Sequence, residues 1–203
     1  MMEPVRIIGI SRHRLTTDGE GVTTLVAFNG CPLRCKYCLN NASWDPMKGK
    51  EYTPERLLDE VKIDQLYFLA THGGVTFGGG EPLLQVEFIK QFRTLCGTQW
   101  RLVAETSLNV PSENVEALDP VLDGYIVDIK DMNPEIYEAY TGGNNAQVIK
   151  NLEWLLQHGD PCRIMVRVPH IPDFNTDEDV AKSMEQLKAM GVVHFDEFKY
   201  IIR

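Results

Sequence analysis

Three cysteines lie within eight residues, in the run Cys31-Pro-Leu-Arg-Cys35-Lys-Tyr-Cys38. This spacing lets one tight loop direct all three thiolates toward a single soft-metal group. A structural zinc site and an ordinary 4Fe–4S cluster each use four protein ligands. Three ligands on a four-iron cluster would leave one iron open for a substrate or a cofactor. Two other interpretations stay open at this point: a zinc site completed by a histidine, and three buried thiols without a metal.

A glycine-rich turn, Gly78-Gly-Gly-Glu-Pro82, is the second candidate site. It follows a short apolar run and precedes a helical pattern, so it is expected to connect a strand to a helix. Backbone without Cβ atoms can approach a ligand closely. A carboxylate at Glu81 can accept hydrogen bonds from a ligand ammonium group. An ordinary strand-to-helix turn would also explain this run.

The composition limits the class of protein. With 203 residues, 43% hydrophobic and 24% charged, the chain is expected to form one domain with a substantial core. The net charge of −9 argues against a nucleic-acid partner, which would need a basic surface. No apolar run approaches membrane length and no secretory leader pattern opens the chain, so no membrane partner is expected. Five cysteines, three of them bunched, indicate a reducing compartment, hence the cytoplasm.

Strand and helix patterns alternate along the chain. A β-rich run at 23–29 ends where the cysteine loop begins, and in α/β sheets ligands bind at that end of the strands. A helix is expected to start after Thr53, with Pro54 in its first position and an apolar stripe that continues to Leu69. Further strands are predicted at 5–10, 75–77, 100–106, 125–129, 163–168 and 194–202, and further helices at 83–96, 112–118, 134–140, 146–158 and 177–190. About six core strands predict an α/β fold of the partial (β/α)6 barrel type in a single domain.

The cysteine pattern C-x3-C-x-aromatic-C, followed by the Gly-Gly-Glu turn, resembles the signature of the radical S-adenosylmethionine (SAM) superfamily. The resemblance implies a 4Fe–4S cluster held by Cys31, Cys35 and Cys38, with SAM on the open iron and Tyr37 as a flat wall beside it. It also implies that Gly79, Gly80 and Glu81 hold the methionine amino group of SAM. Members of this superfamily reduce SAM to release a 5′-deoxyadenosyl radical.

Longer segments resemble one branch of that superfamily, the glycyl radical enzyme activases of the pyruvate formate-lyase activating type. These segments are 17–22, 28–38, 44–45, 74–85 and 128–133, and they stand in the order found in that family, within a similarity that runs from about Ile8 to Tyr200. The resemblance implies an oxidoreductase that takes a hydrogen atom from one glycine of a large partner enzyme under anaerobic conditions. A flavodoxin or a ferredoxin would supply the electron.

The resemblance assigns a monovalent cation, sodium or potassium, to a site beside the SAM carboxylate. Its expected ligands are Glu105, Thr106, the carbonyl of Ile126, and Asp128, all at strand ends. Glu105 stands where the family has an aspartate and is one methylene longer. The alternative for Glu105, Asp128 and Lys130 is an ion pair at the rim of the barrel.

Further positions follow from the same resemblance. Lys130 and Arg167 would pair with the SAM carboxylate, to which Glu105 also lies close, and Asp18 would lie near the bound glycyl peptide. The family places a histidine on the SAM adenosine at a position that corresponds here to about Ile202. Residues 1–203 are expected to form one radical SAM core domain without a C-terminal extension. No catalytic residue is expected beyond the ligands of the cluster and of SAM.

Three alternatives stay open beside the activase. The first is a radical SAM enzyme that acts on a small molecule, similar to 7-carboxy-7-deazaguanine synthase, although the Asp128-Ile-Lys-Asp-Met-Asn133 run favours an activase. The second is a non-enzymatic iron–sulfur electron-transfer protein. The third is a zinc-binding module.

Overall fold

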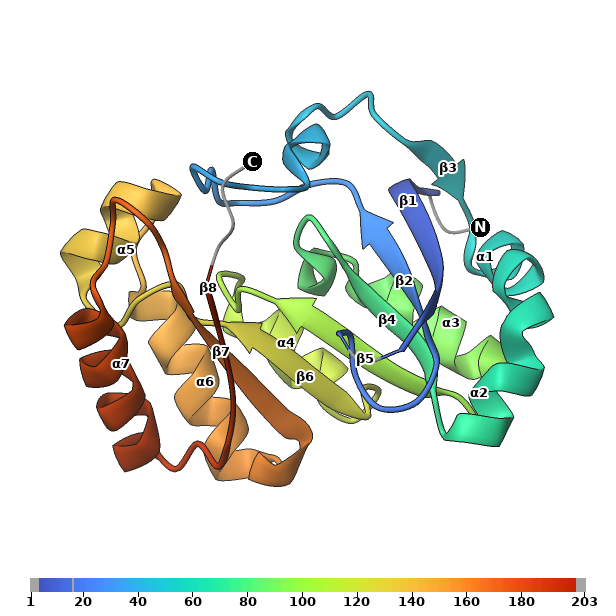
Figure 1. The fold of residues 1–203 in the computed structure, drawn as a ribbon. Helices are drawn as coiled ribbons and strands as arrows, with labels where there is room; N and C mark the ends of the chain where they lie inside the picture. The colour runs from blue at the N-terminus through green and yellow to red at the C-terminus, as the bar shows by residue number, and fades with distance from the viewer. Residues whose placement is uncertain (1–3, 16, 200–203) are drawn as a thin grey trace.

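Six consecutive parallel strands make up most of an eight-stranded sheet in the computed structural model, which describes residues 4–15 and 17–199 (Figure 1). The parallel strands are, in sheet order, β2 (Thr23–Phe28), β4 (Gly74–Gly79), β5 (Arg101–Thr106), β6 (Gly124–Asp128), β7 (Ile164–His170) and β8 (His194–Lys199). Two antiparallel strands, β1 (Val5–Arg14) and β3 (Lys50–Tyr52), extend the sheet beyond β2. The six parallel strands confirm the predicted partial barrel, whose sheet stays open between β3 and β8.

Helices connect the parallel strands and cover the outer face of the sheet (Figure 1). They are α1 (Pro54–Val61), α2 (Gln65–Thr71), α3 (Val86–Cys96), α4 (Ser112–Leu118), α5 (Pro134–Thr141), α6 (Ala146–His158) and α7 (Asp177–Met190), with short 3-10 turns at η1 (Asn41–Trp44), η2 (Lys62–Asp64), η3 (Pro82–Leu84) and η4 (Pro161–Arg163). Along β5, Leu102 and Ala104 are buried under the helices, so Val103 and Glu105 lie on the inner face. Within the described ranges, no helix is both long and apolar enough to cross a bilayer.

The helix ends follow the predicted capping chemistry. Thr53 caps α1 by accepting a hydrogen bond from the Arg56 amide at 3.3 Å, and Pro54 takes the first helical position. At α7 the side chains of Thr176 and Asp179 form a reciprocal capping box. The bounds of α4, α6 and α7 coincide with the predicted ranges.

The predicted continuous helix through Leu69 is wrong, because the chain is interrupted at η2 between α1 and α2. Asp64 ends that turn with a fully buried carboxylate that accepts hydrogen bonds from Arg12 and Thr24. Because the Asp64 side chain points into the core, α2 starts in a different rotation from α1, and Leu66 is 79% exposed instead of facing the core. The structure also shows that β1 continues to Arg14, beyond its predicted end, and that β3 is a strand the sequence did not indicate.

The turn between β1 and β2 folds over the inner face of the sheet (Figure 1). Thr76, in the middle of β4, donates a hydrogen bond to the Asp18 carbonyl at 2.5 Å. Glu20 pairs with Arg101 at the start of β5. Gly21 has φ +71°, and a Cβ there would lie 2.4 Å from the Thr71 carbonyl oxygen, so this turn needs a glycine. The turn therefore closes the amino-terminal end of the barrel and leaves the carboxyl end open.

Candidate functional site

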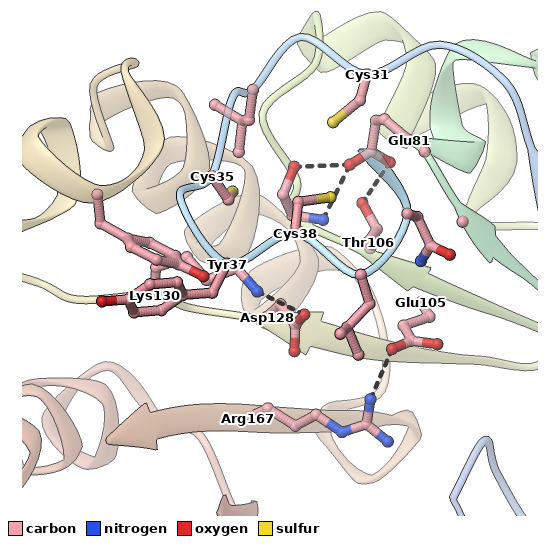
Figure 2. Close-up of a pocket in the computed structure, with 17 residues that line it drawn as sticks. Cys31, Cys35, Tyr37, Cys38, Glu81, Glu105, Thr106, Asp128, Lys130 and Arg167 are labelled. Carbon is pink, nitrogen blue, oxygen red and sulfur yellow. Dashed lines mark hydrogen bonds and ion pairs between the residues drawn. The ribbon is translucent and has the colours of Figure 1, made fainter. Parts of the chain in front are cut away.

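A cavity of about 280 Å³ lies at the carboxyl ends of the parallel strands, beneath the cysteine loop (Figure 2). It brings together most of the residues predicted from the sequence: Cys31, Cys35, Tyr37, Cys38, Gly79, Gly80, Glu81, Glu105, Thr106, Asp128, Lys130 and Arg167. It is also lined by residues that the sequence did not indicate, namely Leu33, Leu39, Asn40, Ser107 and Tyr140. The two remaining predicted residues, Asp18 and Ile126, do not line it.

The cysteine loop spans the mouth of this cavity and is held by main-chain hydrogen bonds at both sides. At its start, the Gly30 amide donates to the Ser43 carbonyl at 2.9 Å. Farther along, the Arg34 amide donates to the Thr141 carbonyl at 2.8 Å and the Lys36 amide to the Tyr140 carbonyl at 3.1 Å. The loop is thus fixed to η1 at one side and to the end of α5 at the other.

The three thiols of the loop are free and partly buried. Burial raises the pKa of Cys31 to about 12 and also raises the pKa of Cys35, where the charge of Lys130 opposes the effect. A bound metal, by supplying positive charge, would favour the thiolate forms of Cys31 and Cys35. Among residues 4–15 and 17–199, no three His, Cys, Asp or Glu side chains converge closely enough to hold a single metal ion. Three thiols on one loop are a donor set that fits a 4Fe–4S cluster, in which each thiolate binds a different iron.

The glycine turn after β4 lies directly against the start of the cysteine loop. The Gly80 amide donates to the Phe28 carbonyl at 2.9 Å, and the Glu81 amide donates to the Gly30 carbonyl at 2.7 Å. A Cβ on Gly80 would lie 2.1 Å from the Gly30 oxygen, and Gly79 has φ +89° with Ala27 only 2.6 Å from a Cβ position. Glycine is therefore required at both positions for the two loops to meet.

The carboxylate of Glu81 accepts hydrogen bonds from residues at the end of β5. It is fully buried and accepts hydrogen bonds from Thr106 Oγ1 at 2.6 Å and from the amide and the hydroxyl of Ser107 at 2.9 and 2.7 Å (Figure 2). Burial raises the pKa of Glu81, and the hydrogen bonds from Thr106 and Ser107 oppose that rise. The predicted contact of Glu81 with a ligand amino group stays a prediction, because both of its carboxylate oxygens already accept hydrogen bonds. Ser107, which the sequence did not single out, fixes this carboxylate.

Two ion pairs line the opposite side of the cavity. Arg167 on β7 pairs with Glu105 at 2.8 Å, and Lys130 pairs with Asp128 at 2.7 Å (Figure 2). Arg167 also pairs with Asp196 on β8 at 3.1 Å, and Asp196 does not line the cavity. Burial and the charge of Asp128 raise the pKa of Glu105 to about 7, against the opposing charge of Arg167. Asp128 Oδ1 is buried and has no hydrogen-bond partner within the described part of the chain. That oxygen is therefore able to accept a hydrogen bond from a ligand or to bind a cation.

The predicted cation ligands differ in their surroundings. Thr106 Oγ1 donates to Glu81 and accepts from the Leu108 amide at 2.9 Å, so its hydroxyl is already engaged on both sides. Ile126 lies opposite Glu105 in the register of β5 and β6. Asp128 Oδ1 is the oxygen that best fits a cation here. The monovalent cation stays a prediction.

Asp18 and Ile202 complete the predicted set. Asp18 is buried, with 2% of the residue exposed, and it lies on the inner face of the sheet. Its carboxylate forms an ion pair with Arg14, whose guanidinium donates to Asp18 Oδ1 at 3.1 Å. In this structure the Asp18 carboxylate is engaged by Arg14, and its contact with a glycyl peptide stays a prediction. Ile202 lies outside the described residues.

Comparison with known proteins identifies the family. The family model of the radical SAM superfamily matches residues 25–187. Pyruvate formate-lyase 1-activating enzyme of Escherichia coli (strain K12) is 32% identical, with 88% of this chain and 73% of the relative covered. The (2S)-3-sulfopropanediol dehydratase activating enzyme of Klebsiella oxytoca is 36% identical, with 86% of this chain and 74% of the relative covered.

Solved structures show the same fold at low sequence identity. TYW1 with a lysine–pyruvate adduct bound superposes with a TM-score of 0.63 at 15% identity, over 89% of this chain and 65% of that one. SuiB of Streptococcus suis, bound to the precursor peptide SuiA, superposes with a TM-score of 0.65 at 14% identity, over 84% of this chain and 37% of that one. This chain spans less than two thirds of either protein, and the likeness concerns the fold alone.

Proposed function

This chain belongs to the radical SAM superfamily, and from that premise we propose that it activates a glycyl radical enzyme. It is a radical SAM enzyme related to the pyruvate formate-lyase activating enzymes. The observation that carries the proposal is the gathering of three thiols, a glycine turn and paired charges around one cavity. The two relatives are both named as activating enzymes of another enzyme, which favours a protein substrate.

In this proposal Cys31, Cys35 and Cys38 hold a 4Fe–4S cluster and leave one iron for SAM. Held by these cysteines, the cluster would supply the one electron for reductive cleavage of SAM to methionine, and the other fragment, with one hydrogen atom taken from a glycine of the partner, would leave as 5′-deoxyadenosine. The protein's part is to bind and orient. The reaction transfers an electron and a hydrogen atom, so no side chain has to act as a general base.

The side chains around the cavity supply complementary charge for SAM. The main chain of the glycine turn, free of Cβ atoms, would accept the methionine amino group, and Asp128 Oδ1 offers a second acceptor. Lys130 and Arg167 would attract the SAM carboxylate, with Arg167 exchanging one of its present carboxylate partners for that of SAM. A monovalent cation bound by Asp128 and Glu105 would also attract the SAM carboxylate.

The remaining parts of the proposal concern the setting of the reaction. We assign all these roles to one radical SAM core domain that works in a reducing, oxygen-free cytoplasm. A flavodoxin or a ferredoxin would deliver the electron. The sheet is open between β3 and β8 in the described residues, which suits a substrate as large as a polypeptide loop.

The first test is reductive cleavage of SAM after anaerobic reconstitution with iron and sulfide. We expect 5′-deoxyadenosine from the parent and none from Cys35→Ala, with retained activity in Cys162→Ala, which removes an exposed cysteine outside the loop. An intact, reducible cluster without cleavage would instead support an electron-transfer protein. Zinc without iron or sulfide would support the zinc module.

The second test addresses the substrate. Pyruvate formate-lyase and (2S)-3-sulfopropanediol dehydratase serve as probes, each labelled with α-deuterated glycine. An activase is expected to produce a glycyl radical by EPR in at least one probe and to carry deuterium into 5′-deoxyadenosine. Cleavage of SAM without a radical in either probe, together with turnover of a small molecule, would favour the deazaguanine-synthase alternative.

A further inference from the structure

Tyr37, which stands between the second and third cysteines, contacts a loop that lies far away in the sequence. Its hydroxyl donates a hydrogen bond to Asp173 Oδ2 at 3.1 Å, across 136 positions of the chain. Its ring meets that of Phe174 edge-on, with centroids 5.8 Å apart and planes at 81°. Both partners belong to the connection between β7 and α7. Tyr37 therefore links the turn that carries Cys35 and Cys38 to the last βα connection described.

Tyr140 completes an aromatic cluster with Tyr37 and Phe174. Its ring centroid lies 5.1 Å from that of Phe174 and 6.0 Å from that of Tyr37, so each ring contacts the other two. Tyr140 is 1% exposed, and its carbonyl accepts the hydrogen bond from the Lys36 amide. The cysteine loop is thus held on this side by its backbone and by the Tyr37 side chain.

The loop that presents Asp173 and Phe174 is itself firmly held. Asn175 is buried, accepts a hydrogen bond from the Ile171 amide at 2.6 Å and donates to Asp131 Oδ2 at 3.1 Å. Asp131 follows Lys130 directly, and Lys130 lines the cavity. Asp173 adopts φ +67°, a conformation that aspartate and asparagine tolerate better than other non-glycine residues. The contacts form one continuous connection from the charged side of the cavity to the cysteine loop.

We propose that Asp173 and Phe174 are positioning residues that fix Tyr37, and through it the Cys35–Cys38 turn, in the geometry that binds SAM. This inference rests on the proposed function, because it concerns the same cofactor. A preformed turn spares the cost of ordering the loop when SAM binds. Residues that orient a metal ligand from outside the coordination sphere commonly change affinity when they are removed.

Three variants isolate the hydrogen bond from its backbone setting. Tyr37→Phe removes the donor, and Asp173→Gly removes the acceptor while tolerating the positive φ. Asp173→Asn keeps an acceptor oxygen and the same backbone preference, so it should restore the parent behaviour. His72→Gly is the matched control, because His72 also has a positive φ (56°) but caps α2, away from the cavity.

The first readout needs neither cluster nor SAM. In the apo-protein, amide hydrogen exchange of Arg34 and Lys36 measures how firmly the loop is held at the end of α5. We expect exchange about fivefold faster in Tyr37→Phe and in Asp173→Gly, and parent rates in Asp173→Asn and His72→Gly. Unchanged exchange in both of the first two variants would overturn the proposal, whether or not the protein cleaves SAM.

The second readout is the KM for SAM in the reconstituted enzyme. Tyr37→Phe and Asp173→Gly are each expected to raise this KM about fivefold with kcat within about twofold, whereas Asp173→Asn and His72→Gly should keep the parent value. The double variant Tyr37→Phe/Asp173→Gly should show about the same fivefold rise. The effects are not expected to multiply, because both changes remove one hydrogen bond. If the KM of the double variant rose by the product of the two single effects, the hydrogen bond would not be what positions Tyr37. The same conclusion would follow if Asp173→Asn behaved like Asp173→Gly. Absence of SAM cleavage in the parent would count against the proposed function. The positioning role of Asp173 and Phe174 would then be decided by amide hydrogen exchange in the apo-protein.

Discussion

Gly80 is the residue at which two predicted motifs meet, because the cysteine loop and the glycine turn touch there. A methyl group on Gly80 would overlap the Gly30 carbonyl oxygen, which belongs to the backbone and cannot rotate away. We expect Gly80→Ala to separate the two loops, to destabilise the protein by about 2 kcal/mol and to reduce SAM cleavage more than tenfold. Urea denaturation and the 5′-deoxyadenosine assay measure the two effects.

Gly9→Ala is the matched control for that variant. Nothing lies within 4 Å of a Cβ at Gly9, so the same methyl group enters open space. The control is expected to leave cleavage unchanged and to shift stability by less than about 1 kcal/mol. If Gly80→Ala behaved like Gly9→Ala, close approach of the two loops would not be needed for the site.

Glu105 is expected to make stability depend on pH. Burial, followed by the charge of Asp128, raises its pKa to about 7, so the folded protein holds a proton that the unfolded chain has already released. The contribution of Glu105 to the free energy of unfolding is therefore fully present below about pH 4.5 and is lost as the pH rises toward 7. The total loss is at most about 3 kcal/mol. Glu105→Gln should lack this decline. Parallel pH profiles of parent and variant, from urea denaturation, would contradict the assignment.

The chemistry of single residues was predictable where it depends on local spacing. The three cysteines and the glycines of the turn follow each other in the sequence, and the structure places them around one cavity. The direction of the Glu81 side chain was not predictable, because its donors Thr106 and Ser107 come from the next strand. The contact of Tyr37 with Asp173 depends on the closure of the sheet, which no local pattern encodes.

Among the elements, the interruption between α1 and α2 has a specific electrostatic cause. The Asp64 carboxylate is fully buried and accepts hydrogen bonds from Arg12 Nε at 2.7 Å and Thr24 Oγ1 at 3.0 Å, with His13 Nε2 at 2.9 Å. Burial alone would raise the pKa of Asp64, but these hydrogen bonds and charges outweigh it and lower the pKa. The interaction therefore stabilises the fold at neutral pH and is lost as the pH falls through the lowered pKa.

Asp64→Ala should therefore cost about 2–3 kcal/mol at neutral pH, because it leaves the buried Thr24 hydroxyl without its acceptor and Arg12 without its partner. Asp59→Ala serves as control. Asp59 is exposed and, among the described residues, forms an ion pair with Lys62 one turn away, so its removal should cost less than about 0.5 kcal/mol. Urea denaturation at pH 7 compares the two. Equal costs would mean that the buried pair does not determine the break in the helix.

Elements with a regular apolar stripe and clear caps were predicted well, and α6 and α7 show this most plainly. The break at Asp64 was not predictable, since its partners Arg12 and Thr24 lie on strands about fifty and forty positions away. Strand β3 was missed for a related reason. Its three residues form a strand only because β1 offers a free edge beside them.

At the scale of the whole molecule, the cysteine loop joins two parts of the sheet that lie on either side of the central strands. The loop leaves β2, touches the glycine turn after β4, and reaches α5 and the connection after β7. A cluster bound by three cysteines of this loop would add a covalent framework at the crossing point. Since the unfolded chain cannot hold the same framework, binding should stabilise the folded state.

We therefore expect anaerobic loading of the cluster to raise the melting temperature by about 5 °C, which for a chain of this size corresponds to about 2 kcal/mol. Removal of iron with a chelator should reverse the rise. Cys35→Ala, treated with iron and sulfide in the same way, should melt at the temperature of its own apo-protein, because two remaining thiols cannot close the loop around a cluster. A parent that takes up iron and sulfide without any rise in melting temperature would show that the unfolded chain binds them as well as the folded protein does. In that case the three cysteines would bind iron without needing the fold, and the loop would not be the prepared site that this prediction assumes.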